Sequence, residues 1–238
     1  MLELTGHSEY SEQWTKESLH FESTGIYEKL AAQIPSGKVL EIGCGAGVGT
    51  FHLAQDREVL SIDNNALLIR AAKSYLDGRT NGYRIHECDL FAISNDDRAA
   101  VRDFAPNTIV AWFLGGSGID VYKHTSEHPD PIEKGKRYRE KIEDIVISSD
   151  LLIDSVDVVN FVSRGGRISH FSNEQAREAA KDDYDTYVFK NVGFEVYDVR
   201  LFDWSLDGSN FIYGAANNPN LAPGTPIPTI TSILARRI

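Results

Sequence analysis

The chain has 238 residues, 42% of them hydrophobic, which is enough for one α/β domain with additions. Asp and Glu (35) outnumber Lys and Arg (24), and the formal net charge of −11 argues against nucleic acid as the main partner. The two cysteines, Cys44 and Cys88, form no C-x-x-C pair, which argues against a zinc or redox site and fits a reducing cytoplasm. The chain begins with no signal-like segment, and no run approaches the roughly 20 apolar residues of a membrane span. We therefore expect a cytoplasmic protein with no membrane partner.

The first 34 residues are expected to form helices ahead of the first strand. Residues 1–24 are polar, with aromatic side chains at loosely helical spacing. Residues 25–34 put Ile26, Leu30 and Ile34 on one face, as an amphipathic helix does. Residues 35–37, Pro-Ser-Gly, end this helical segment.

A strand, a glycine-rich turn and a helix are predicted between residues 38 and 54. Residues 39–42 are an apolar, β-type run interrupted only by Glu41, and glycines follow at positions 43, 45, 47 and 49. Glycine adopts positive φ and leaves room for a ligand to approach the backbone. The helix that follows presents free N–H groups to an electronegative ligand. The dinucleotide pattern G-x-G-x-x-G fails here, because Val48 or Thr50 stands where its third glycine belongs.

Two carboxylates are predicted to lie at the ends of the next two strands. Residues 57–63 form a second strand ending at Asp63, about 20 residues past Gly43, the spacing at which a βαβ unit places an acid on ribose hydroxyls. An ionised carboxylate accepts from both vicinal hydroxyls. A helix is expected over residues 64–76, and a short strand over 82–85 precedes Asp89.

These three segments resemble, in order, the motifs of class I S-adenosylmethionine-dependent methyltransferases, over residues 37 to about 113. The resemblance implies that S-adenosylmethionine is the cofactor, and that Asp89 accepts a hydrogen bond from the adenine amino group. It also implies that the N-terminal segment is a lid over the site, although that segment could instead simply pack on the domain surface. The residues expected to bind the cofactor are Glu41, Gly43, Cys44, Gly45, Gly47, Asp63, Asn64, Asp89, Leu90 and Trp112.

The rest of the chain is expected to complete the sheet. Residues 108–114 form a continuous apolar run, typical of a buried parallel strand. The irregular segment 115–134 that follows either shapes the acceptor pocket or is a surface insertion. The later elements predicted are helices over 95–104, 137–148, 155–162 and 173–190, and strands over 167–171, 194–202 and 210–216.

We therefore predict a single α/β domain over residues 1–238. Its core would be a seven-stranded, mostly parallel, doubly wound sheet with helices on both faces and a C-terminal antiparallel β-hairpin, as the resemblance implies. The predicted additions are the helical segment 1–34, the insertion 115–134 and an extended tail over 219–238.

Methyl transfer depends chiefly on alignment of donor and acceptor, so few residues can be assigned to the chemistry from the sequence. Histidine titrates near neutrality and suits proton removal, which makes His170 and His124 the candidate catalytic bases, with His128 on the same loop as His124. His170 could equally be a packed residue at a strand end. His52 is expected only to lie near the cofactor. The acids are too scattered to predict a metal site.

The function predicted is methyl transfer from S-adenosylmethionine to a small-molecule acceptor. The Asn/Asp-Pro-Pro-aromatic tetrad of enzymes that methylate nucleic-acid amines is missing after the fourth strand, where residues 114–117 read Leu-Gly-Gly-Ser. Two alternatives stay open: a protein or RNA methyltransferase, and a non-catalytic cofactor-binding partner or regulatory subunit. The broken glycine pattern disfavours a dehydrogenase.

Overall fold

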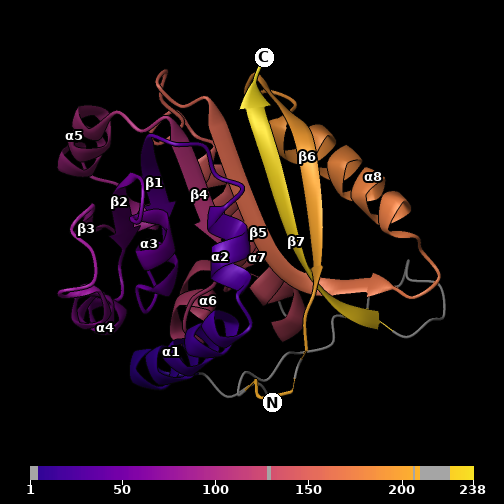
Figure 1. Ribbon diagram of the computed structural model, residues 1–238, viewed down its shortest axis with the longest axis horizontal. Coiled ribbons are helices and arrows are strands. Elements are labelled where there is room, and N and C mark those ends of the chain that lie inside the picture. The colour runs from indigo at the N-terminus through magenta and orange to yellow at the C-terminus, as the bar shows by residue number, and fades with distance from the viewer. Residues whose placement is uncertain (1–4, 128–129, 206, 210–225) are drawn as a thin grey trace.

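The computed structural model describes residues 5–127, 130–205, 207–209 and 226–238, and these residues form one seven-stranded sheet flanked by helices (Figure 1). The strands are β1 (Lys38–Ile42), β2 (Glu58–Asp63), β3 (Tyr83–Glu87), β4 (Thr108–Trp112), β5 (Val158–Ile168), β6 (Phe194–Asp203) and β7 (Pro226–Arg237). Their order across the sheet is β3-β2-β1-β4-β5-β7-β6. Strands β1 to β5 pair in parallel, and β7 pairs antiparallel with both β5 and β6. The predicted fold class is confirmed.

The helical elements lie between and around these strands. They are α1 (His7–Ser23), α2 (Ile26–Ala31), α3 (Val48–Leu53), α4 (Ala66–Leu76), η1 (Leu90–Ala92), α5 (Asn95–Phe104), α6 (Gly118–His124), α7 (Pro131–Val146), α8 (Asn173–Tyr184) and η2 (Asp185–Phe189). No helix in the described ranges combines the length and the apolar character needed to cross a membrane.

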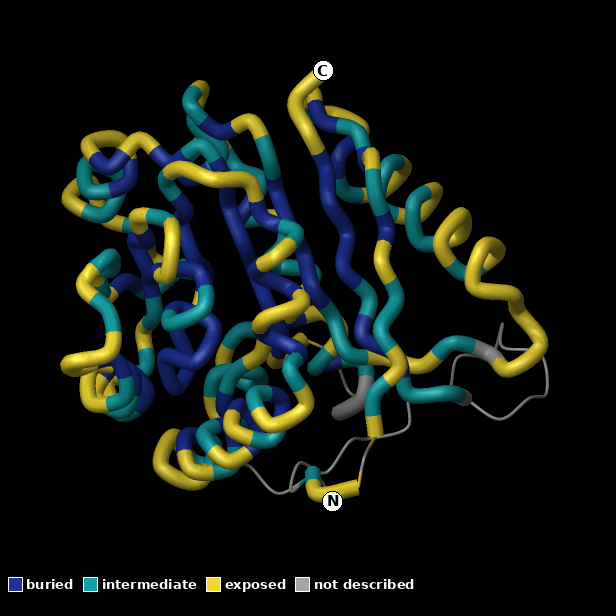
Figure 2. The backbone as a smooth tube through the Cα atoms, in the orientation of Figure 1, coloured by how far each residue is buried: buried dark blue, intermediate teal, exposed yellow. Residues whose placement is uncertain are grey.

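Alternation along the central strands builds a core on each face of the sheet, which the burial map shows as dark blue strands between half-exposed helices (Figure 2). Leu40, Ile109 and Phe161 face the layer formed by α5, α7, α8 and η2. Val39 and Val110, next along the same strands, face the layer formed by α1, α2 and α3. Successive side chains of a strand point to opposite faces, so parallel strands covered on both sides read as continuous apolar runs.

The fifth strand begins earlier than the sequence predicts. The helix predicted over 155–162 and the strand predicted over 167–171 are both wrong, because β5 extends over Val158–Ile168. The Arg164-Gly165-Gly166 stretch, which resembles a turn, lies inside this strand, where Gly165 pairs with Thr229 and Gly166 with Pro228 of β7. Glycine adopts extended backbone as well as turn conformations. Pairing with the long strand β7 favours the extended conformation here.

The last strand also differs from its predicted position. The strand predicted over 210–216 falls outside the described residues. The antiparallel partner of β6 is β7, in the part of the chain predicted to be an extended tail. Residues 229–235 bury Ile233 on one face of the sheet and Ile230 and Leu234 on the other. This burial on both faces stabilises a strand although the segment is rich in proline at its start.

A buried hydrogen-bond network ties β4, β5 and β7 together. Asn160, which is fully buried, accepts a hydrogen bond from the Trp112 indole N–H at 2.6 Å. Its amide group donates to the Ser232 hydroxyl and to the Ile233 carbonyl, each at 2.9 Å. The network occupies all the polar atoms of the Asn160 side chain, and it fixes the indole of Trp112, which lies at the carboxyl end of β4.

Replacing Asn160 by Ala should lower the free energy of unfolding by about 3 kcal/mol, because it leaves buried polar groups of Trp112 and Ser232 without their partner. Urea denaturation followed by circular dichroism measures this loss. The matched control is Ser163→Ala on the same strand, because Ser163 is half-buried and its side chain donates no hydrogen bond within the described residues. Equal, small losses in both variants would contradict the role assigned to the network.

Candidate functional site

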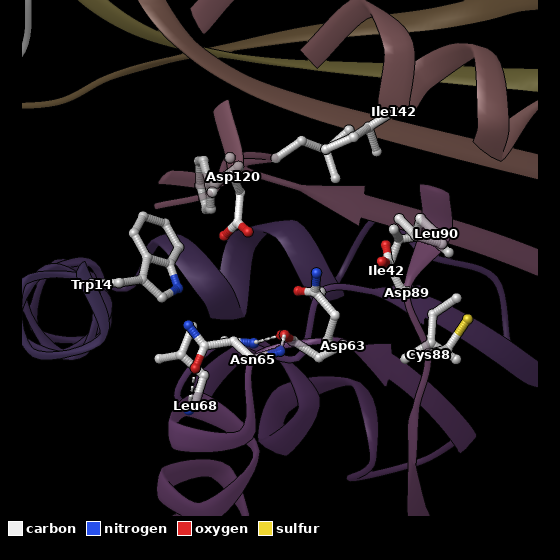
Figure 3. Close-up of a pocket in the computed structure, with 18 of the residues that line it drawn as sticks. Trp14, Ile42, Asp63, Asn65, Leu68, Cys88, Asp89, Leu90, Asp120 and Ile142 are labelled. Carbon is white, nitrogen blue, oxygen red and sulfur yellow. Dashed lines mark hydrogen bonds between the residues drawn. The ribbon is translucent and has the colours of Figure 1, made fainter. Parts of the chain in front are cut away.

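A pocket open to solvent lies at the carboxyl ends of β1 to β4 (Figure 3), and its empty space, with the adjoining solvent included, is about 720 Å³. The order β2-β1-β4-β5 changes winding direction between β1 and β4, and ligands of open α/β sheets bind outside the carboxyl ends of the strands at such a point. Tyr10 and Trp14 of α1 close one side of the pocket. Asp120 of α6 and Tyr138 of α7 close another.

The glycine turn after β1 forms the floor of the pocket. Gly43, Gly45 and Gly47 all have positive φ, at 81°, 50° and 85°. A Cβ at Gly47 would lie 2.8 Å from the Ala72 Cα, so this glycine allows α3 and α4 to approach each other. A Cβ at Gly43 would meet no atom within 4 Å, because Gly43 faces the open space of the pocket. Gly43 is therefore the glycine whose missing side chain leaves room for a ligand.

Asp63, the last residue of β2, fixes this turn. Its carboxylate accepts hydrogen bonds from the backbone N–H of Gly45 at 3.1 Å and of Asn65 at 2.8 Å. Burial raises the pKa of Asp63, and these backbone hydrogen bonds oppose that rise because they favour the ionised form. Asp63 and its neighbour Asn64 both line the pocket, and the carboxylate lies across the floor from Asp120 (Figure 3).

The third predicted segment reaches the same pocket from β3. Asp89 and Leu90 line it. The Asp89 side chain also caps the start of η1, where it accepts a hydrogen bond from the backbone N–H of Phe91 at 3.0 Å. Trp112, at the end of β4, lines it too. Of the predicted cofactor-binding residues, the pocket thus brings together Gly43, Gly45, Asp63, Asn64, Asp89, Leu90 and Trp112.

Three predicted residues do not line the pocket. Glu41 is 3% exposed and accepts hydrogen bonds from the hydroxyls of Thr50, at 2.6 Å, and Ser61. The Cys44 side chain is buried below the turn, with its sulfur 3.6 Å from the Asp63 carboxylate. Gly47 contacts α4, as described above. These three residues support the turn from its inner side, because on β1 and in the loop they face the protein interior and not the pocket.

The histidines predicted as bases also lie outside the lining of the pocket. His124 stacks on Phe91, with ring centroids 3.8 Å apart, and burial together with the nearby Lys123 lowers its pKa. His170 is exposed in the turn after β5, and no described contact brings it to the pocket. His52 pairs with Glu22 at 2.7 Å on the far side of the glycine turn, and His128 falls outside the described residues. No metal-binding group of three or more His, Cys, Asp or Glu occurs in the described ranges.

The sequence named no single residue of the opposite wall, although it gave the N-terminal segment as a possible lid and residues 115–134 as a possible wall of the acceptor pocket. Tyr10 and Trp14 of that N-terminal segment line the pocket, but no motif marks these two positions. Asp120 and Tyr138 come from the segment expected to be irregular and from the helix after it. A Cβ at Gly45 would lie 2.5 Å from the Trp14 indole nitrogen, so α1 lies directly against the glycine turn.

Comparison with known proteins supports the fold assignment. No protein-family model matches this chain, and no curated protein matches its sequence. A solved structure from Pyrococcus horikoshii, titled as a candidate RNA methyltransferase, is 12% identical, with a TM-score of 0.51 over 91% of this chain and 83% of that one. Magnesium protoporphyrin IX methyltransferase from Synechocystis, solved with bound S-adenosylmethionine, is 13% identical, with a TM-score of 0.47 over 93% of this chain and 79% of that one. The strand order and the Pyrococcus structure together establish the class I methyltransferase fold for this chain.

The buried Glu41 is expected to make the free energy of unfolding depend on pH. Burial raises its pKa from 4.5 to about 7, more than the Ser61 and Thr50 hydrogen bonds lower it. Because the folded pKa exceeds the unfolded one, the stabilising contribution is complete below about pH 4.5 and is lost as the pH rises through about 7.

Glu41→Gln should remove this dependence, since the amide does not ionise. The free energy of unfolding of the wild-type protein should fall relative to the variant by about 3 kcal/mol from about pH 5 to about pH 8. Urea denaturation of both proteins at the two pH values measures the difference. Glu143, whose pKa burial also raises to about 7, is present in both and cancels. Parallel pH profiles would show that Glu41 does not titrate in this range.

Proposed function

We propose that this protein is a methyltransferase that uses S-adenosylmethionine and acts on a small-molecule acceptor. The observation that carries the proposal is the convergence of Gly43, Asp63 and Asp89 on one pocket at the switch point of a class I methyltransferase sheet. Each comes from a different strand end, and a nucleoside with an amino-acid tail needs partners of these three kinds. The candidate RNA methyltransferase with this fold supports the class of reaction and not the acceptor.

The residues of the pocket fit the proposed cofactor. Gly43 leaves an open space at the turn that a side chain would fill, which suits the approach of the amino-acid end to the backbone. Asp63 uses part of its capacity on two backbone N–H groups and retains lone pairs for ribose hydroxyls. Asp89, with Leu90 beside it, offers an acceptor to the adenine amino group. When bound, S-adenosylmethionine supplies an electrophilic methyl group on a sulfonium.

The wall formed by Tyr10, Trp14 and Phe113 supports a role in orienting the reactants and excluding water. These aromatic side chains line the pocket, and apolar rings beside a bound cofactor would displace water from it. Helix α1 is attached to the start of α4 by hydrogen bonds between Ser11 and the Asn65 side chain, the shorter of them 3.1 Å. An acceptor that fits inside such a pocket is a small molecule, and the net charge of −11 also disfavours RNA.

Calorimetry with S-adenosylhomocysteine tests the cofactor directly. We expect micromolar-scale binding of S-adenosylhomocysteine and no binding of NAD, because the glycine pattern lacks the dinucleotide register. Incubation with methyl-labelled donor then tests the acceptor. Label in small molecules supports the proposal, whereas label in RNA or protein favours the corresponding alternative. Tight binding of NAD with none of S-adenosylhomocysteine would overturn the proposal as a whole.

Gly43→Ala should abolish binding of S-adenosylhomocysteine, because its Cβ would occupy the space left for the ligand. Positive φ strains any L-residue, so the variant should also lose about 1 kcal/mol of stability. The matched control is Gly78→Ala in the turn after α4, where φ is 68° and a Cβ also meets nothing within 4 Å. Both variants should melt lower than wild type, and only Gly43→Ala should lose the rise in melting temperature that the ligand produces. If both variants keep that rise, Gly43 does not border the ligand.

A further inference from the structure

The pocket has a second wall whose residues are not needed to hold the proposed cofactor. Tyr10 and Trp14 come from α1, Asp120 from α6, and Tyr138 from α7. Figure 3 shows the Asp120 carboxylate pointing into the pocket from the side opposite Asp63, with Trp14 beside it. This wall borders the space in which an acceptor would lie.

Asp120 offers one carboxylate oxygen to that space. Its side chain is 17% exposed, and Oδ2 accepts a hydrogen bond from the Ser117 hydroxyl at 2.7 Å. His7 lies 3.5 Å from the same oxygen. Oδ1 accepts no hydrogen bond from any described residue. Ser117 therefore orients the carboxylate and leaves its second oxygen for a ligand.

Tyr138 provides a polar group with no partner. The residue is only 5% exposed, but its hydroxyl oxygen is not among the buried atoms, and it makes no hydrogen bond within the described part of the chain, so it is open to the pocket. The ring is held against Phe91, with centroids 5.4 Å apart, and the hydroxyl lies beside Gly116 at the pocket. Burial and, next, the negative charge of Asp120 raise the pKa of Tyr138, and both side chains line the same pocket.

The charge of the pocket selects among ligands. Its described lining contains three carboxylates, Asp63, Asp89 and Asp120, and no Lys, Arg or His. Arg164 lies behind the wall, with its guanidinium 4.9 Å from the Trp14 ring, and does not line the pocket. Like charges repel an anionic acceptor, whereas a carboxylate among aromatic rings attracts an amine or its cation.

We propose that the methyl acceptor is an amine, bound between Oδ1 of Asp120 and the hydroxyl of Tyr138. This inference rests on the proposed function and specifies its substrate class. An amine N–H donates to the Asp120 carboxylate and another to the Tyr138 oxygen, which leaves the nitrogen lone pair for attack. Tyr10, Trp14 and Phe113 surround the carbon skeleton of the acceptor.

The transfer balances without a further reactant. A protonated amine first releases one proton to solvent. The nitrogen lone pair then forms a bond to the methyl carbon as the carbon–sulfur bond breaks, and sulfur keeps that electron pair as a neutral thioether. The product is a methylated ammonium ion, which Asp120 stabilises by its charge.

The experiment compares shape-matched pairs that differ in the acceptor group: phenethylamine with phenylacetate, and tyramine with 4-hydroxyphenylacetate. Each is tested for binding to the protein saturated with S-adenosylhomocysteine, by melting temperature and tryptophan fluorescence, and for transfer of label from methyl-labelled donor. We expect binding and N-methylation of at least one amine and neither for the matched acids.

Asp120→Asn should lower kcat/KM for the amine by about 10- to 100-fold, the range for a hydrogen bond to a charged group. The amide can still accept from Ser117, so the start of α6 and the affinity for S-adenosylhomocysteine should be preserved. Asp103→Asn on α5, an exposed acid away from the pocket, is the matched control and should leave transfer unchanged.

Tyr138→Phe separates a binding role from a structural one. The variant removes a pocket-facing hydroxyl that makes no hydrogen bond within the described residues, so it should melt close to the wild-type temperature while binding the amine less tightly by about 3- to 10-fold. A lower melting temperature with unchanged amine binding would indicate a purely structural role.

The outcomes that overturn the inference differ from those that overturn the proposed function. If the wild-type protein does not bind S-adenosylhomocysteine, the proposed function itself is overturned. If S-adenosylhomocysteine binds normally, three results would leave the proposed function in place and overturn the assignment of an amine acceptor. They are label in acids or phenolic oxygens, no amine bound or methylated, and amine methylation that survives Asp120→Asn.

Discussion

A buried carboxyl group holds the glycine-turn side of this fold together. Glu41 lies on β1 and accepts hydrogen bonds from Ser61 on β2 and Thr50 on α3, so one side chain joins two neighbouring strands to the helix that follows the glycine turn. An ionised group in such a place is unfavourable unless it is hydrogen-bonded, and the protein provides two hydroxyls for it. The position of the turn relative to β2 depends on this contact, and with it the position of every residue on the pocket floor.

Asp63, at the surface of the pocket, is a second carboxyl group that joins neighbouring elements by hydrogen bonds. Its hydrogen bonds to Gly45 and Asn65 connect the glycine turn to the start of α4, where the Asn65 side chain in turn accepts from the backbone of Leu67 and Leu68. A ligand that bound Asp63 would therefore meet a carboxylate already held in place by rigid elements. Preorganisation of this kind reduces the ordering that binding requires.

The part of the site that the sequence predicts is the part built from local order. A strand, a turn and a helix place Gly43, Asp63 and Asp89 at neighbouring strand ends, and their spacing along the chain is sufficient to find them. The opposite wall is different, because Trp14, Asp120 and Tyr138 come together only through packing between distant segments. Local patterns also failed at β5, where Gly165 and Gly166 resemble a turn and the pairing with β7 makes them extended. The partner strand of β6 was predicted at residues 210–216, but β6 pairs with β7. The prolines at the start of β7 argue against a strand locally, and burial in the folded protein stabilises one.

The contact between α1 and the glycine turn has an evolutionary consequence. Gly45 has no side chain, and the space a Cβ would fill is occupied by the indole of Trp14, 2.5 Å from its expected position. The two residues, 31 positions apart in the numbering, thus share one volume. In homologous chains we expect them to covary: a larger residue at the position of Gly45 should accompany a smaller one at the position of Trp14, and the aromatic ring should persist only where the glycine does.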